Sequence, residues 1–411
     1  MDEPRGRRWW RPAVPGAAMV RSYRRPWLRG DLIAGVTVAA YLVPQVMAYA
    51  QVADLPAVAG LWAALPPLLF YTLLGSSRSL SMGPESTTAL MTAAAIGPLA
   101  AGDPARYALL AAALAIGVGL AAVAAWLVRL GFVADLLSRP VLVGYLAGVA
   151  VIMITGQLAR LTGVPVAGRT FVAELTSFAS GMGQAQPATI LLAALVLAFL
   201  FVVRARWPRA PGPLIAVLLS AAVVWAGGLQ QHGIAVVGAV PAGLPTPGLP
   251  HLSRGDLASL VLPALTVLAV AFTDDVLTAR SFAQRDEQVD ASQEFLALGA
   301  SNIGAGLLHG FPVSSSASRT AIARSAGSHT QVYSLAALVT VLAVLLFGGR
   351  VLASFPDAAL GAIVVYAATR LIDVTAFRRL AAFRRSEFLI ALATCAGVLV
   401  FNILYGVLIA I

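Results

Sequence analysis

Apolar runs of about 18 residues or more recur along the whole of this chain and constrain its fold more than any other feature. A helix of about 20 apolar residues crosses the roughly 30 Å hydrocarbon core of a bilayer. Hydrophobic residues make up 59% of the 411 residues and charged residues only 11%, whereas soluble domains carry about 25% charged residues. We therefore predict an all-α polytopic membrane protein with about fourteen transmembrane segments. The expected segments are 33–50, 57–74, 85–100, 106–129, 140–158, 187–203, 212–229, 257–280, 293–309, 318–327, 331–348, 356–372, 386–399 and 400–411.

The basic residues indicate how the chain is oriented in the membrane. The net charge is +10 and the pI is near 10.6, but the arginines lie in short loops between apolar runs. That distribution is typical of the cytoplasmic side of a membrane protein and not of a nucleic-acid-binding surface. With an even number of segments, we expect both termini on the cytoplasmic side of the plasma (inner) membrane. The clusters that follow segments four, six, eight and twelve are Arg129; Arg204, Arg206 and Arg209; Arg280 and Arg285; and Arg378, Arg379, Arg384 and Arg385.

Metal, cofactor and enzyme sites are not expected. Cys395 is the only cysteine and lies in a late apolar segment, so there is no disulfide framework and no thiol metal site. The four histidines lie at expected helix ends and loops, and the sequence contains no HExxH or GxSxG motif. No cleavable signal peptide is visible before the first apolar run, because the N-terminus is long and rich in arginine.

The sequence divides into two halves that resemble each other. A polar break at 79–88 opens the short third segment, and a break at 310–320 opens the short tenth segment at a similar place in the second half. Paired interrupted segments of this kind are the best sequence indication of a transporter binding site. Seven segments per half would make the second half run inverted in the membrane. The predicted parts are a basic cytoplasmic segment (1–30), a first repeat (31–230), a linker rich in Pro and Gly (231–256) and a second repeat (257–411).

The two breaks have the chemistry of an anion site. Two half-helices that begin near the middle of the membrane would present unpaired amides and partial positive charge to the same point. The hydroxyls of these breaks can replace waters stripped from an oxyanion, and Arg319 adds a full charge. The alternative is that the hydroxyls only cap helices and that Arg319 is a structural ion pair. The hydroxyl residues are Ser86, Thr87, Thr88, Ser314, Ser315, Ser316 and Ser318.

Other polar residues within apolar segments are candidates for coupling and for the pocket wall. Asp274 and Thr278 are four residues apart on one helical face, so they could hold Na⁺, or Asp274 could carry a proton. Asp275 is expected to point to another face and to be structural. Gln45 follows a proline that should kink the first segment, with Tyr49 one turn further on. Gln45 could donate to an anion or only join two helices.

These residues resemble the sulfate permease (SulP) family, in particular actinobacterial members described as sulfate transporters. The resemblance covers nearly the whole chain. It is carried by the stretch Asp31–Ala50, by Gly75–Arg78, Gly83–Pro84, Asp274–Arg280, Glu294 with Gly299–Asn302, and by Ser318–Thr320.

The resemblance implies a seven-plus-seven inverted repeat that is divided into a core and a gate domain, with the anion bound between the third and tenth segments. It also implies a homodimer with a cytosolic STAS domain after the last segment, and this sequence carries no such domain. Asp274 and Thr278 match the position that relatives use for cation coupling. The predicted anion-binding residues are Gln45, Tyr49, Glu85, Ser86, Thr87, Ala317, Ser318 and Arg319.

Two departures from the family pattern shape the functional prediction. Glu85 stands where many relatives have an apolar or small residue, and Ser315 and Ser316 replace Gly or Ala of the sodium-coupled members. We expect a secondary carrier that takes up sulfate with H⁺ or Na⁺ by elevator-like alternating access, and in which Glu85 shares or releases a proton as sulfate binds. The alternatives are a bicarbonate or dicarboxylate transporter or anion exchanger of the same fold, or an uncoupled anion channel.

Overall fold

The computed structural model describes residues 14–131, 139–166, 171–208, 210–239, 243–283 and 287–401. The first residues of the basic N-terminal segment, Arg209, Arg285 and nearly all of the predicted segment 400–411 lie outside the described residues. The helices of the first half are α1 (Pro15–Arg21), α2 (Trp27–Val52), α3 (Ala57–Leu74), α4 (Ser86–Ala100), α5 (Pro104–Leu127), α6 (Arg139–Gly156), α7 (Leu158–Thr162), α8 (Phe171–Gly181), α9 (Pro187–Arg206) and α10 (Gly212–Ala226). Those of the second half are α11 (Arg254–Phe282), α12 (Ala291–Leu307), α13 (Ala317–Ser325), α14 (Val332–Phe347), α15 (Gly349–Ala353), α16 (Asp357–Thr369), α17 (Val374–Phe383) and α18 (Arg385–Phe401).

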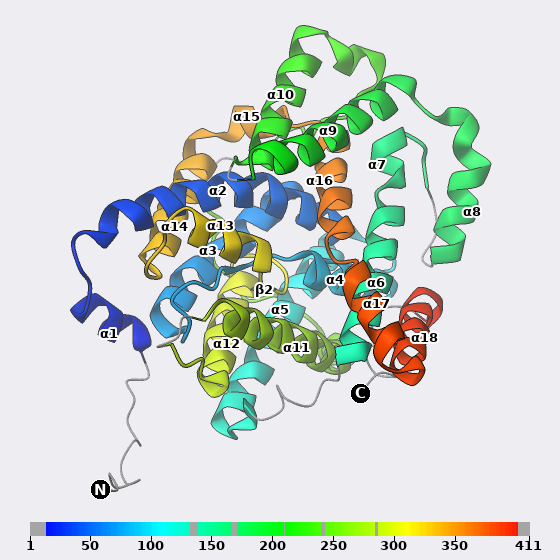
Figure 1. Ribbon diagram of the computed structural model, residues 1–411. Coiled ribbons are helices and arrows are strands. Elements are labelled where there is room, and N and C mark those ends of the chain that lie inside the picture. Colours follow the sequence, from blue (N-terminus) through cyan, green and yellow to red (C-terminus); the bar gives the residue numbers. More distant parts are fainter. Residues whose placement is uncertain are drawn as a thin grey trace, which may run out of the picture.

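Each of the first thirteen predicted segments coincides with a helix (Figure 1). Among the described residues, seven spans are long and apolar enough to cross a membrane: α2, α3, α5, α9, α11 and the pairs α6–α7 and α16–α17. The helices α4, α10 and α14 are apolar but shorter. We did not predict α8 and α17, because both interrupt their apolar residues with polar or charged ones; α17 exposes Arg378 and Arg379.

The helices pack as two groups, and each group takes members from both halves of the chain. The core group comprises α2 to α5 and α11 to α14, with α12 lying along α5 and α3, and α14 along α2. The gate group comprises α6, α7, α9, α10 and α16 to α18, with α18 along α6 and α16 along α9. In Figure 1, α6, α16, α17 and α18 lie together on the right, while α2 crosses the centre. Contacts of α2 with α16 and α10 join the two groups.

Glycines allow the core helices to approach each other closely. A Cβ on Gly119 of α5 would lie 2.7 Å from the backbone oxygen of Gly299 on α12, and one on Gly299 would lie 3.0 Å from the oxygen of Gly119. Likewise, a Cβ on Gly60 of α3 would collide with the carbonyl of Val46 on α2. Membrane helices use small residues in this way because lipid offers no hydrophobic driving force for their association.

The two polar breaks meet as a short antiparallel pair of strands, which the sequence did not predict. β1 (Met82–Gly83) pairs with β2 (Ser314–Ser315), with Met82 opposite Ser315, and the Ser316 amide donates to the Ser81 carbonyl at 2.8 Å. Backbone that is not helical within a membrane protein needs internal partners, and this pairing supplies them. It also joins the two segments that lead into α4 and α13 through backbone hydrogen bonds.

Candidate functional site: the junction of α4 and α13

Arg319 is the centre of the junction where α4 and α13 begin. Its side chain is completely buried. Nη1 donates to the Pro84 carbonyl at 3.0 Å and to Gln45 Oε1 at 3.3 Å, and Nε lies 3.4 Å from Ser81 Oγ. Among the described residues, Nη2 has no hydrogen-bond partner. A buried guanidinium with an unused donor is a ready partner for an anion.

The first turns of both half-helices surround this arginine. Glu85 and Ser316 are the N-cap residues of α4 and α13, and neither side chain caps its helix. Uncapped amides and the helix dipole favour a negative group at each end. Ser86 and Thr87 are buried in the first turn of α4, whereas Ala317 at the start of α13 is exposed and Ser318 is half-buried. Ser318 Oγ lies 3.1 Å from Ser316 Oγ.

Glu85 brings a negative charge to the same junction. Its Oε2 lies 3.9 Å from Arg319 Nη1, and its Oε1 accepts from Ser86 Oγ at 3.1 Å. Oε2 is buried and has no hydrogen-bond partner among the described residues. The carboxylate therefore faces Arg319 without a tight ion pair, and it would stand close to any anion that Arg319 bound.

Gln45 and Tyr49 of α2 close the junction from a third helix. Gln45 Nε2 donates to the Tyr49 hydroxyl at 2.9 Å, while Gln45 Oε1 accepts from Arg319. Both side chains are buried. The amide thus bridges Arg319 and Tyr49 and joins α13 to α2, in line with the interhelical reading of Gln45. Donation from Gln45 to an anion stays a prediction.

The structure brings both aspartates of α11 to β2. Asp274 Oδ2 lies 3.5 Å from Ser315 Oγ, and Asp275 Oδ1 accepts from the Ser315 amide at 2.6 Å. Asp275 does occupy another face, but it is not remote from the junction, because it holds the strand that precedes α13. Thr278 is buried one turn beyond Asp274. In the described part of the chain, no group of three or more His, Cys, Asp and Glu side chains could hold a metal ion.

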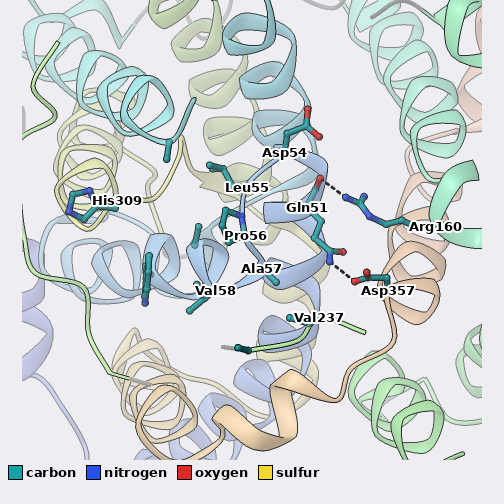
Figure 2. Close-up of a pocket in the computed structure, with 14 residues that line it drawn as sticks. Gln51, Asp54, Leu55, Pro56, Ala57, Val58, Arg160, Val237, His309 and Asp357 are labelled. Carbon is teal, nitrogen blue, oxygen red and sulfur yellow. Dashed lines mark hydrogen bonds between the residues drawn. The ribbon is translucent and has the colours of Figure 1, made fainter. Parts of the chain in front are cut away.

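A second polar region lies at the end of α2. A cavity of about 640 Å³ is lined by Gln51, Asp54, Arg160, His309 and Asp357 together with apolar residues of α3 (Figure 2). We did not predict this cavity. Its residues come from six separate stretches of the chain, and no spacing in the sequence connects them. The Ser81 hydroxyl and the Pro84 carbonyl were also missed as partners of Arg319. A backbone acceptor leaves no signal in the sequence except the Gly83–Pro84 pair, and the serine lies 238 positions from the arginine.

Comparisons with known proteins give the same family over nearly the whole chain. The family model described as "Sulfate permease family" matches residues 28–394. A probable sulfate transporter of Mycobacterium tuberculosis is 57% identical over 400 residues, which cover 97% of this chain and 71% of that protein. Solute carrier family 26 member 6 of Homo sapiens is 30% identical over 414 residues, 94% of this chain and 54% of that protein.

Two solved structures share the fold. SLC26A9 superposes with a TM-score of 0.90 at 23% identity, covering 97% of this chain and 66% of that one. The transmembrane domain of the cyanobacterial bicarbonate transporter BicA superposes with a TM-score of 0.83 at 24% identity, covering 95% of this chain and 98% of that one. The predicted fold of two inverted seven-segment repeats is thereby confirmed. The chain belongs to the sulfate permease family of membrane anion transporters.

Proposed function

We propose that this protein takes up sulfate by alternating access, and that the anion binds at the junction of α4 and α13. Relatives that are 57% identical are named as probable sulfate transporters, which supports sulfate over other anions. The observation that carries the proposal is the Arg319 side chain, which is wholly buried and is held by Gln45 of α2 and by Ser81 and Pro84 on either side of β1. Its Nη2 has no hydrogen-bond partner among the described residues. The core group would carry the bound anion past the gate group.

We propose further that Glu85 couples uptake to protons. A divalent anion at Arg319 would lie next to the Glu85 carboxylate, and the two negative charges would repel each other in a region that water reaches poorly. A neutral Glu85 removes this repulsion and can donate a hydrogen bond to the anion. Bound sulfate and Glu85 would then share a proton, which would cross the membrane with the anion and leave when sulfate is released on the other side.

Asp274 is the second candidate for coupling. It lies 3.5 Å from Ser315 Oγ, so a cation there would contact α11 and the strand that leads into α13. Thr278 lies one turn away on the same helix. A sodium ion held by Asp274 and Thr278 is therefore the alternative to the proton. The homodimer and the cytoplasmic position of both termini stay predictions.

The test is uptake of radiolabelled sulfate into proteoliposomes with an inward proton gradient, with an inward Na⁺ gradient and with neither. We expect accumulation only with the proton gradient. Accumulation driven by Na⁺ would move the coupling to Asp274. If bicarbonate or a dicarboxylate accumulates and sulfate does not, the substrate assignment is wrong. Flux that dissipates a gradient without saturating would identify an anion channel.

A further inference from the structure

Gln51, at the end of α2 in the core group, forms two hydrogen bonds with residues of the gate group (Figure 2). The Gln51 side chain donates through Nε2 to Asp357 Oδ1 of α16 at 2.8 Å. Arg160 of α7 donates through Nη2 to the backbone oxygen of Gln51 at 3.0 Å. Each bond therefore joins a helix of the core group to a helix of the gate group.

The gate side of this contact is firmly positioned. Arg160 Nη1 donates to Gln157 Oε1 at 3.0 Å, and Gln157 is only 3% exposed. A Cβ on Gly361 of α16 would lie 3.2 Å from the Arg160 Cβ, so α16 packs directly on the arginine. The Asp357 amide donates to the Ala235 carbonyl at 3.1 Å. Arg160 and Asp357 are thus held within the gate group, whereas Gln51 belongs to the core group.

The contact lies between the cavity and the anion junction. Gln51, Arg160 and Asp357 all line the cavity of about 640 Å³. Gln51 follows Gln45 by six residues, which is roughly 9 Å along the axis of α2. Gln51 Oε1 is buried and has no hydrogen-bond partner in the part of the chain that the structure describes. Each bond involves one charged group, the Asp357 carboxylate or the Arg160 guanidinium. Both bonds lie next to an accessible cavity, where water can take the place of a lost partner, so this contact can open.

From these observations we propose that Gln51, Arg160 and Asp357 form a latch between the core and gate groups that opens once in every transport cycle. The inference rests on the alternating access of the proposed function. A displacement of α2 by more than about 1 Å relative to α7 and α16 would carry both donor–acceptor pairs beyond hydrogen-bond distance. The closed latch therefore holds one arrangement of the two groups and seals the Gln51 end of α2.

The first experiment measures the separation of the two groups without any substrate. Spin labels are attached to Ala105→Cys in α5 of the core group and to Gln184→Cys in the turn that leads into α9 of the gate group, both exposed, in a Cys395→Ser background. The distance distribution is recorded by pulsed electron paramagnetic resonance for the unaltered latch, for Gln51→Leu combined with Arg160→Met, and for Asp357→Asn. The last variant is the matched control, since asparagine keeps an oxygen that accepts from Gln51 Nε2.

We expect the Gln51→Leu, Arg160→Met protein to raise the ratio of the longer to the shorter separation by about three- to tenfold, and Asp357→Asn to leave it unchanged. An identical distribution in all three proteins would overturn the latch. Circular dichroism and gel filtration verify that each variant is folded. Because no anion is present, this result does not depend on whether the protein transports sulfate.

The second experiment locks the contact. Gln51→Cys and Asp357→Cys in the Cys395→Ser background are bridged by mercuric ion, which binds two thiolates, and sulfate uptake is measured before and after release with dithiothreitol. We expect at least a tenfold reversible loss of uptake, unchanged sulfate binding, and no loss in either single-cysteine variant. Full uptake by the bridged protein would overturn the proposal. Absence of uptake by the unbridged protein would instead count against the proposed function.

Discussion

At the residue scale, two of the three guanidinium nitrogens of Arg319 have hydrogen-bond partners among the described residues, and the third has none. Nε and Nη1 are occupied by Ser81, Pro84 and Gln45, while Nη2 is buried without a partner in the described structure. The planar fork of arginine can hold several acceptors in fixed directions at once, and the compact ammonium of lysine cannot. Charge alone is therefore insufficient at this position.

We predict that Arg319→Lys lowers sulfate affinity by about ten- to a hundredfold, as expected for the loss of hydrogen bonds to a charged group. Isothermal titration calorimetry of the purified protein measures the affinity. Arg324→Lys on the same helix is the control, because Arg324 Nη1 donates to a single carbonyl, that of Phe282 at 2.6 Å, and lysine can replace that one bond. Equal affinity of Arg319→Lys and the unaltered protein would contradict the central role of the guanidinium.

Glu85 is the residue through which we expect binding to depend on pH. As the pH falls, a larger fraction of Glu85 is neutral, so sulfate affinity should rise. Glu85→Gln mimics the neutral side chain, and we predict that it keeps high affinity at every pH and no longer accumulates sulfate in response to a proton gradient. Uptake into proteoliposomes between about pH 5 and 8 measures both effects. Proton-driven accumulation that survives in Glu85→Gln would show that another group couples transport.

At the scale of elements, the junction depends on how closely the helices approach. Gly60 of α3 has no room for a Cβ beside the Val46 carbonyl of α2, and Gly144 of α6 has none beside the Ala391 carbonyl of α18. The first contact holds α2, which carries Gln45 and Tyr49, against the rest of the core group. Space at these backbones is thus a requirement for the geometry of the site.

We predict that Gly60→Ala destabilises the protein by several kcal/mol because α2 and α3 must separate, or prevents folding altogether; overpacking typically costs about 1–3 kcal/mol. Gly97→Ala in α4 is the matched control, since nothing lies within 4 Å of a Cβ there and alanine favours the helix by about 1 kcal/mol. Thermal unfolding monitored by size-exclusion chromatography compares the two variants. A Gly60→Ala protein as stable as Gly97→Ala would show that α3 can shift freely.

At the scale of the whole molecule, we expect the distribution of arginine to determine how the protein lies in the membrane. Gln184 precedes α9, and Arg379 lies on α17; both are exposed. From the excess of arginine in the loops on the Arg379 side, we predict that this side faces the cytoplasm.

We predict that, in a Cys395→Ser background, Gln184→Cys reacts with a membrane-impermeant maleimide in intact cells, whereas Arg379→Cys reacts only after the cells are permeabilised. The two variants are controls for each other, because both positions are exposed and both are treated with the same reagent, and we expect opposite results. Labelling of Arg379→Cys in intact cells, without labelling of Gln184→Cys, would show that the orientation is opposite to the predicted one.

Much of this architecture was readable from single stretches of the chain. Apolar runs are local, and a helix in lipid must satisfy its own backbone, so thirteen predicted segments coincide with helices. The family was recognisable from motifs such as Asp31–Ala50, and the polar breaks at 79–88 and 310–320 were recognisable as a pair.

Only the tertiary structure decided what those breaks contact. The pairing of β1 with β2, the acceptors of Arg319 and the approach of Asp275 to Ser315 join residues more than 35 positions apart, and several use backbone atoms that every residue possesses. The latch likewise brings together Gln51, Arg160 and Asp357 from three helices. The hydrophobic pattern of the sequence indicates which residues are buried. Which of those residues contact each other depends on how distant helices pack, and small residues such as glycine determine how closely the helices approach.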